Sequence, residues 1–123
     1  MDENSLDRAK EFQDRTKLFA IRVVKMFRAL PKTDEARIIG KQALRSATSV
    51  AANYRAACRA RSKAEFIAKM GLVVEEMDET VFWLELLVDA DVMSADRMKG
   101  LVDEANELLA ISSASLNTAR KRR

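Results

Sequence analysis

Residues that interrupt a helix are scarce in this sequence, which has one proline, Pro31, and three glycines among 123 residues. Proline lacks the backbone N–H that a helix interior needs, and glycine weakens a helix through its conformational freedom. The rest of the chain is rich in Ala, Leu, Glu, Lys and Arg, which have the strongest helix propensities. The sequence therefore predicts an all-α protein.

Apolar residues recur at alternating intervals of three and four in four segments, which is typical of amphipathic helices. Pro31 ends the first segment, and the spacing of Ser62 and Glu65 is that of a capping box at the start of the third. Connectors of only a few residues place successive helices side by side and antiparallel. We therefore predict one domain, residues 1–123, folded as an antiparallel up-and-down four-helix bundle. The expected helices cover residues of about 5–30, 34–61, 62–91 and 94–121.

Nothing in the sequence indicates a membrane or secreted protein. It contains no run of about 18 apolar residues, and its first residues lack the basic and then apolar pattern of a signal peptide. Cys58 is the only cysteine, which suits a reducing compartment, and we expect it to be a small buried side chain. We predict a soluble cytoplasmic protein that makes no membrane contact.

Signatures of catalysis and of cofactor binding are also missing. The sequence has no histidine, which excludes a Ser-His-Asp triad, and its glycines stand too far apart for a phosphate-binding loop. Glu76 and Glu79, like Glu104 and Glu107, have a Glu-x-x-Glu spacing, but a carboxylate-bridged di-metal site in a bundle also uses histidine. We expect no enzyme activity, no cofactor and no metal.

Charge is unevenly distributed along the chain. Residues 5–30 and 34–61 each carry a net charge of +4, whereas residues 62–92 carry −6 and residues 94–123 carry +2. One interpretation is internal, with ion pairs between the second and third helices or between subunits. The residues expected to form these pairs are Arg45, Arg55 and Arg59 on one side and Glu75, Glu76 and Glu79 on the other.

The other interpretation is an external polyanion. Clustered Arg and Lys side chains neutralise phosphates and release counterions, which gives salt-sensitive binding without sequence preference. RNA or DNA is then the expected partner, and backbone contact is more consistent with the sequence than base stacking, since Trp83 and Tyr54 lie on helix-packing faces. The candidate phosphate-binding residues are Arg15, Arg22, Lys25, Lys41, Arg45, Arg59, Arg61, Arg120, Lys121, Arg122 and Arg123.

Residues 81–88, VFWLELLV, are apolar almost all the way round a helix, with only Glu85 interrupting. A helix face that cannot reach its own core needs another partner. Large aromatic side chains on a surface are typical interface anchors, so Phe82, Trp83 and Leu86 are our candidates for an oligomer contact. The alternative is that this helix is simply the most buried of the four.

Three stretches resemble the small bacterial four-helix bundle proteins that are in part encoded in intervening sequences of 23S ribosomal RNA genes. These stretches are Arg45-Ser46-Ala47, SVAANYRAACRARSKAEF from Ser49 to Phe66, and EEMDETVFWLELL from Glu75 to Leu87. The resemblance extends over essentially the whole chain. It implies a ring-shaped homopentamer, and kinship with the accessory variability protein of diversity-generating retroelements, a basic pentamer that works with nucleic acid and a reverse transcriptase.

Several residues match types that are frequent in that family: Ser49, Asn53, Ser62, Glu65, Phe66 and Glu79. We expect mainly structural roles for them. Asn53 is expected to bond a neighbouring backbone or side chain and fix the register between helices, and Glu79 to pair with Arg55 or Arg45. A nucleic-acid or protein contact at these positions is the alternative.

Two hypotheses on function follow from the sequence. The first is a non-enzymatic oligomeric accessory protein that binds nucleic-acid phosphates through basic helix faces. The second is a structural or protein-interaction module whose charges are used in interhelical and intersubunit ion pairs.

Overall fold

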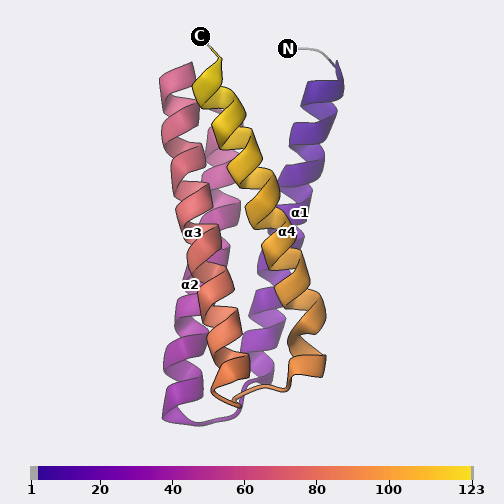
Figure 1. Ribbon diagram of the computed structural model, residues 1–123, viewed down its shortest axis with the longest axis vertical. Coiled ribbons are helices and arrows are strands. Elements are labelled where there is room, and N and C mark those ends of the chain that lie inside the picture. The colour runs from indigo at the N-terminus through magenta and orange to yellow at the C-terminus, as the bar shows by residue number, and fades with distance from the viewer. Residues whose placement is uncertain (1–2, 123) are drawn as a thin grey trace.

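The computed structural model describes residues 3–122. It contains four helices in this part of the chain, α1 (Glu3–Ala29), α2 (Asp34–Cys58), α3 (Lys63–Asp89) and α4 (Ala95–Lys121), and no strand. The helices run alternately down and up the long axis (Figure 1). The connections α1–α2 and α3–α4 lie at one end of the bundle, and the α2–α3 connection lies at the other end with both termini. The predicted all-α antiparallel four-helix bundle is confirmed.

The boundary between the second and third helices differs from the predicted one. α2 ends at Cys58 and not at residue 61, because Arg59 N and Ala60 N bond to carbonyls only three residues back and close the last turn. Ser62 is the cap that precedes α3, and its hydroxyl accepts a bond of 3.1 Å from Glu65 N. The Glu65 carboxylate accepts from Arg61 N at 3.2 Å. In a capping box it would accept from the N–H of the cap residue itself, Ser62, so the bond is displaced by one residue.

Hydroxyl side chains also begin two other helices. Thr33 accepts from Ala36 N at 3.3 Å before α2, and Ser94 accepts from Arg97 N at 3.3 Å before α4. Each side chain satisfies a backbone N–H that has no partner within its helix. The starts of α2, α3 and α4 are therefore each fixed by a nearby hydroxyl side chain.

The core consists of the apolar stripes that the sequence periodicity predicts. Small residues of α2 allow close helix approach, and α2 with α3 forms the most extensive helix contact, while α1 with α4 forms the smallest. α1 and α3 do not touch each other and occupy diagonal corners. Fully buried core side chains include Phe19, Val23, Ala43, Ala47, Val50, Met70, Val73, Met77, Leu84, Leu87, Met98 and Leu108.

A buried hydroxyl pair joins α2 to α3. Thr80 Oγ1 donates to Ser46 Oγ at 2.8 Å, and Ser46 Oγ donates to Ala43 O at 3.2 Å. These bonds fix the register between the two helices. Asn53, which we expected to do so, instead donates to Ser49 O and Ser49 Oγ within α2, both at 3.0 Å.

Cys58 is exposed at the end of α2, so the expectation of a buried thiol is wrong. Its position in the last turn, next to the α2–α3 connection, places it at the bundle surface. Tyr54, one turn earlier, is buried and packs edge-on against Phe12 of α1, with ring centroids 4.7 Å apart. In the described part of the chain, no helix is long and apolar enough to cross a membrane.

Candidate nucleic-acid interface

A groove of about 630 Å³ lies where α2 ends and α3 begins. The alanines of α2 in its lining carry little side-chain bulk, so space remains between the longer side chains around them. Its lining consists of Ala52, Arg55 and Ala56 from α2, Arg59 and Arg61 from the connection, and Glu65 and Lys69 from α3.

The groove carries four cationic side chains and a single carboxylate. Among the described residues, none of the four cations forms an ion pair with a carboxylate. The carboxylate of Glu65 accepts from the Arg61 backbone, which is part of the α3 start. The groove therefore has an excess of positive charge available to an anion. Arginine presents a planar fork of donors that fits a phosphate, and lysine adds a point charge.

The basic end of α4 lies at the same end of the bundle (Figure 1). Arg120 and Lys121 occupy its last turn, Arg122 is its cap, and all three are exposed. Arg123 lies outside the described residues. This end of the molecule therefore combines the groove with three further cations.

Two arginines from the candidate phosphate-binding set are bound by carboxylates within the chain. Arg15 pairs with Glu104 at 2.6 Å and with Glu107 at 3.2 Å, which joins α1 to α4. The hydrogen bond that Arg15 donates to Glu104 is the main reason that the pKa of Arg15 is raised.

Arg45 is held in the same way between α2 and α3. Its guanidinium binds Glu76 at 3.1 Å and also binds Glu79. Partial burial acts to lower the pKa of Arg45, but the two carboxylates more than offset that effect and raise it. Both Glu-x-x-Glu segments therefore hold an arginine. In residues 3–122 no group of His, Cys, Asp or Glu side chains is arranged to bind a metal ion.

The other predicted ion pairs are not formed in the described structure, where Arg55, Arg59 and Glu75 have no ion-pair partner. The interpretation of the charges as interhelical ion pairs thus holds for Arg45, and it also holds for Arg15, for which it was not predicted. Arg55 and Arg59 instead line the groove.

Three candidate phosphate-binding residues lie away from the groove. Arg22 and Lys25 are exposed on the second half of α1, and Arg22 lies beside Gly100 of α4. Lys41 is exposed in the first half of α2, near the opposite end of the bundle. Lys69, in the second turn of α3, is a cationic groove residue that is absent from the predicted phosphate-binding set. Its segment has a net charge of −6, and judging the whole segment by that value leaves out a single lysine.

The side chains of the apolar segment of α3, residues 81–88, differ in how far they are exposed. Phe82 is 54% exposed, whereas Trp83 and Leu86 are half-buried. The Phe82 and Trp83 rings contact each other edge-on at 4.9 Å, and Trp83 Nε1 donates to Glu79 Oε1 at 3.2 Å. Phe82 is thus the aromatic side chain of this segment that is most available to a partner.

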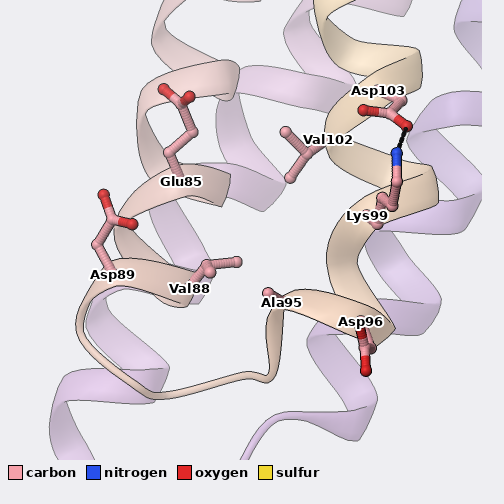
Figure 2. Close-up of a pocket in the computed structure, with 8 residues that line it drawn as sticks. All are labelled: Glu85, Val88, Asp89, Ala95, Asp96, Lys99, Val102 and Asp103. Atoms are coloured by element: carbon pink, nitrogen blue, oxygen red, sulfur yellow. Dashed lines mark hydrogen bonds and ion pairs between the residues drawn. The ribbon is translucent and has the colours of Figure 1, made fainter.

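A second pocket, of about 310 Å³, has the opposite charge and lies near the α3–α4 connection. Val88 and Val102 point into the space between the helices, and Lys99 binds Asp103 at 2.7 Å (Figure 2). Four carboxylates and one lysine surround this space, so it repels phosphate. Its lining residues are Glu85, Val88, Asp89, Ala95, Asp96, Lys99, Val102 and Asp103.

These features define a charge-segregated four-helix bundle protein with a basic groove at one end. A family model described as 23S rRNA-intervening sequence protein matches residues 9–114, so the chain belongs to that family. It is also similar to the crystal structure of a protein of unknown function from the S23 ribosomal protein family of Bacteroides thetaiotaomicron VPI-5482. That match has 29% sequence identity and a TM-score of 0.82, and it covers 89% of this chain and 97% of the other. No curated protein matches the chain.

Proposed function

We propose that the protein is a non-enzymatic, homo-oligomeric accessory protein that binds the phosphate backbone of RNA or DNA. The observation that carries this proposal is the groove at the α2–α3 connection, where Arg55, Arg59, Arg61 and Lys69 stand without a carboxylate partner in the described structure. The exposed cations at the end of α4 lie at the same end of the bundle (Figure 1). Membership of a family named for 23S rRNA intervening sequences is consistent with a nucleic-acid partner.

The proposed binding surface is smaller than the one predicted from sequence. Arg15 and Arg45 are assigned to the stability of the bundle, because each binds two glutamates. Contacts to phosphates carry no sequence information, so we expect binding to depend strongly on salt and weakly on sequence. The oligomer is proposed from the exposed Phe82 and from the family resemblance, which implies a pentamer.

The test is binding of the purified protein to labelled single- and double-stranded RNA and DNA across a salt series. We expect affinity to fall linearly in a log–log plot between about 50 and about 200 mM salt. Arg59→Glu and Lys69→Glu should each weaken binding to every sequence alike and lower the salt slope by about 1 or more. Lys41→Glu is the matched control, since Lys41 is an exposed cation of α2 outside the groove.

Two results would contradict this proposal. If Lys41→Glu weakens binding as much as Arg59→Glu, the groove is not the binding surface. If the folded wild-type protein does not bind at low salt, nucleic-acid binding is wrong. The second outcome favours the alternative, a structural or protein-interaction module, which is supported by the use of Arg15 and Arg45 in interhelical ion pairs.

A further inference from the structure

Two helix faces lie outside both the core and the groove. On α3 the exposed residues follow one another at intervals of three or four, and on α1 adjacent pairs repeat at an interval of four, so each face follows one side of its helix. The α1 face consists of Lys17, Leu18, Ile21, Arg22, Lys25 and Arg28. The α3 face consists of Leu72, Glu75, Asp78, Phe82, Glu85 and Asp89.

The two faces are complementary in composition. Each exposes two large apolar side chains, which are 58% exposed at Leu18, 41% at Ile21, 42% at Leu72 and 54% at Phe82. From Lys17 onward all four charged residues of the α1 face are basic, and Asp14, one turn earlier on the same side, is bound by Lys10 at 2.8 Å. All four charged residues of the α3 face are acidic. None of these eight charged residues forms an ion pair within the described part of the chain. Charges of opposite sign on two surfaces steer the surfaces together and fix their register, so the two faces are complementary partners for each other.

One chain cannot bring its own two faces together. α1 and α3 make no contact, and each of them packs against α2 and α4. They therefore occupy diagonal corners of the bundle, and the two faces of one chain do not meet. Only another molecule can cover either face.

The two faces also match in level along the bundle. α1 and α3 both have 27 residues, and both run from the same end of the molecule (Figure 1). Lys25 follows Glu3, the first residue of α1, by 22 residues, and Glu85 follows Lys63, the first residue of α3, by the same number. Ile21 and Phe82 follow those first residues by 18 and 19. Two copies side by side with parallel axes therefore bring Ile21 to the level of Phe82 and Lys25 to the level of Glu85.

We infer that the α1 face of one copy packs against the α3 face of a second copy. Such a contact is heterologous: each chain offers one face to the neighbour on either side, and repetition gives a closed ring or a filament. A contact of two α3 faces would instead oppose carboxylates with carboxylates, which is unfavourable. The inference rests on the proposed oligomer. It is independent of nucleic-acid binding, because the groove is not part of either face.

The test is the molar mass of the full-length protein without nucleic acid, measured by light scattering at several concentrations. We expect Ile21→Glu and Phe82→Glu each to reduce the assembly to the chain mass of 13.9 kDa. Ile38→Glu is the matched control: Ile38 is 64% exposed on α2, outside both faces, and this variant should assemble like the wild type. Circular dichroism and thermal unfolding of each variant verify that the bundle is folded.

Mixing the two variants tests the direction of the contact. Ile21→Glu retains an intact α3 face, and Phe82→Glu retains an intact α1 face. An equimolar mixture should therefore form a dimer of one chain of each kind and nothing larger. Lys25→Glu and Glu85→Lys should each weaken assembly, and the two changes combined in one chain should restore it.

The outcomes separate this inference from the proposed function. A wild-type protein that stays monomeric at all concentrations overturns both the oligomer and the contact. An assembled wild type together with an assembled Ile21→Glu variant overturns the contact alone, as does a mixture that stays monomeric. Loss of RNA or DNA binding in Arg59→Glu, with the mass unchanged, bears on the groove and not on these faces.

Discussion

Arg15 of α1 binds the carboxylate of Glu104 of α4 through two contacts, Nη2 to Oε1 at 2.6 Å and Nε to Oε2 at 3.1 Å. This two-point pairing fixes the orientation of both side chains and not only their separation. It joins the two helices that have the smallest direct contact in the bundle. The ion pair thus replaces part of the apolar packing that closes the other sides of the bundle.

We predict that Arg15→Gln lowers the free energy of unfolding by about 1 kcal/mol, since the pair is partly buried and has good geometry. Urea unfolding at a fixed protein concentration measures the change. Lys10→Gln is the control, because Lys10 binds Asp14 at 2.8 Å in a fully exposed pair within one helix. Its effect should stay below about 0.5 kcal/mol, and equal effects of the two changes would show that Arg15 does not join α1 to α4.

The buried hydroxyl pair of α2 and α3 supplies a second prediction. Thr80→Val removes the donor to Ser46, which still donates to Ala43 O, so we expect a loss of about 1 kcal/mol. Ser46→Ala should cost a similar amount. The double variant should be more stable than the sum of both losses implies, by about 0.5–1 kcal/mol, because each single change already removes the bond between Thr80 and Ser46, which can be lost only once. Strict additivity in this double-mutant cycle would argue against the bond.

Two helical glycines should respond in opposite ways to alanine. A Cβ at Gly71 would meet no atom within 4 Å, whereas at Gly40 it would overlap Leu30 Cδ1 and lie 3.0 Å from the Phe27 ring. Gly71→Ala should therefore gain up to about 1 kcal/mol from helix propensity. Gly40→Ala gains the same amount but must displace buried side chains, which costs about 1–3 kcal/mol. Thermal unfolding of the pair should rank Gly71→Ala higher, and a reversed order would contradict the close approach of α1 to α2.

The sequence was sufficient to predict the number of helices, their order and their antiparallel arrangement, because apolar periodicity and short connectors are local signals. It was less accurate where a helix ends. Nothing in RARSKA, residues 59–64, opposes helix formation. Even so, α2 ends at Cys58, where Arg59 N and Ala60 N bond to carbonyls three residues back, and bonds of Ser62 and Glu65 begin α3. Such bonds depend on the entry of the chain into α3, which propensity does not describe.

The candidate interface was harder to predict than the fold. Net charge per helix reports how many charges a helix carries but not which neighbour each one meets. Arg15 and Glu104 are 89 positions apart in the sequence, and their pairing depends on how α1 and α4 are rotated about their own axes. For the same reason Lys69 was overlooked and Arg55 was assigned to an ion pair, although both line the groove.

Tyr54 makes the stability of the bundle sensitive to alkaline pH. Burial raises the pKa of its phenol above the ordinary value of 10.0, with smaller contributions from Cys58. Between the ordinary value and the raised one, the unfolded chain loses the phenolic proton while the folded chain keeps it. The unfolded state then binds fewer protons, so the free energy of unfolding falls as the pH rises above about 10, by at most about 1.4 kcal/mol per pH unit.

Two variants isolate this effect: Cys58→Ala alone, and Cys58→Ala combined with Tyr54→Phe. Both lack the exposed thiol, so its titration does not contribute to the difference between them. Thermal unfolding at several pH values from about 8.5 to about 11.5 should give curves that run parallel below pH 10 and diverge above it. The chain that retains Tyr54 should lose stability faster. Parallel curves over the whole range would mean that Tyr54 ionises as readily in the folded protein as in the unfolded chain, and that its phenol is not shielded by Phe12 and the end of α2.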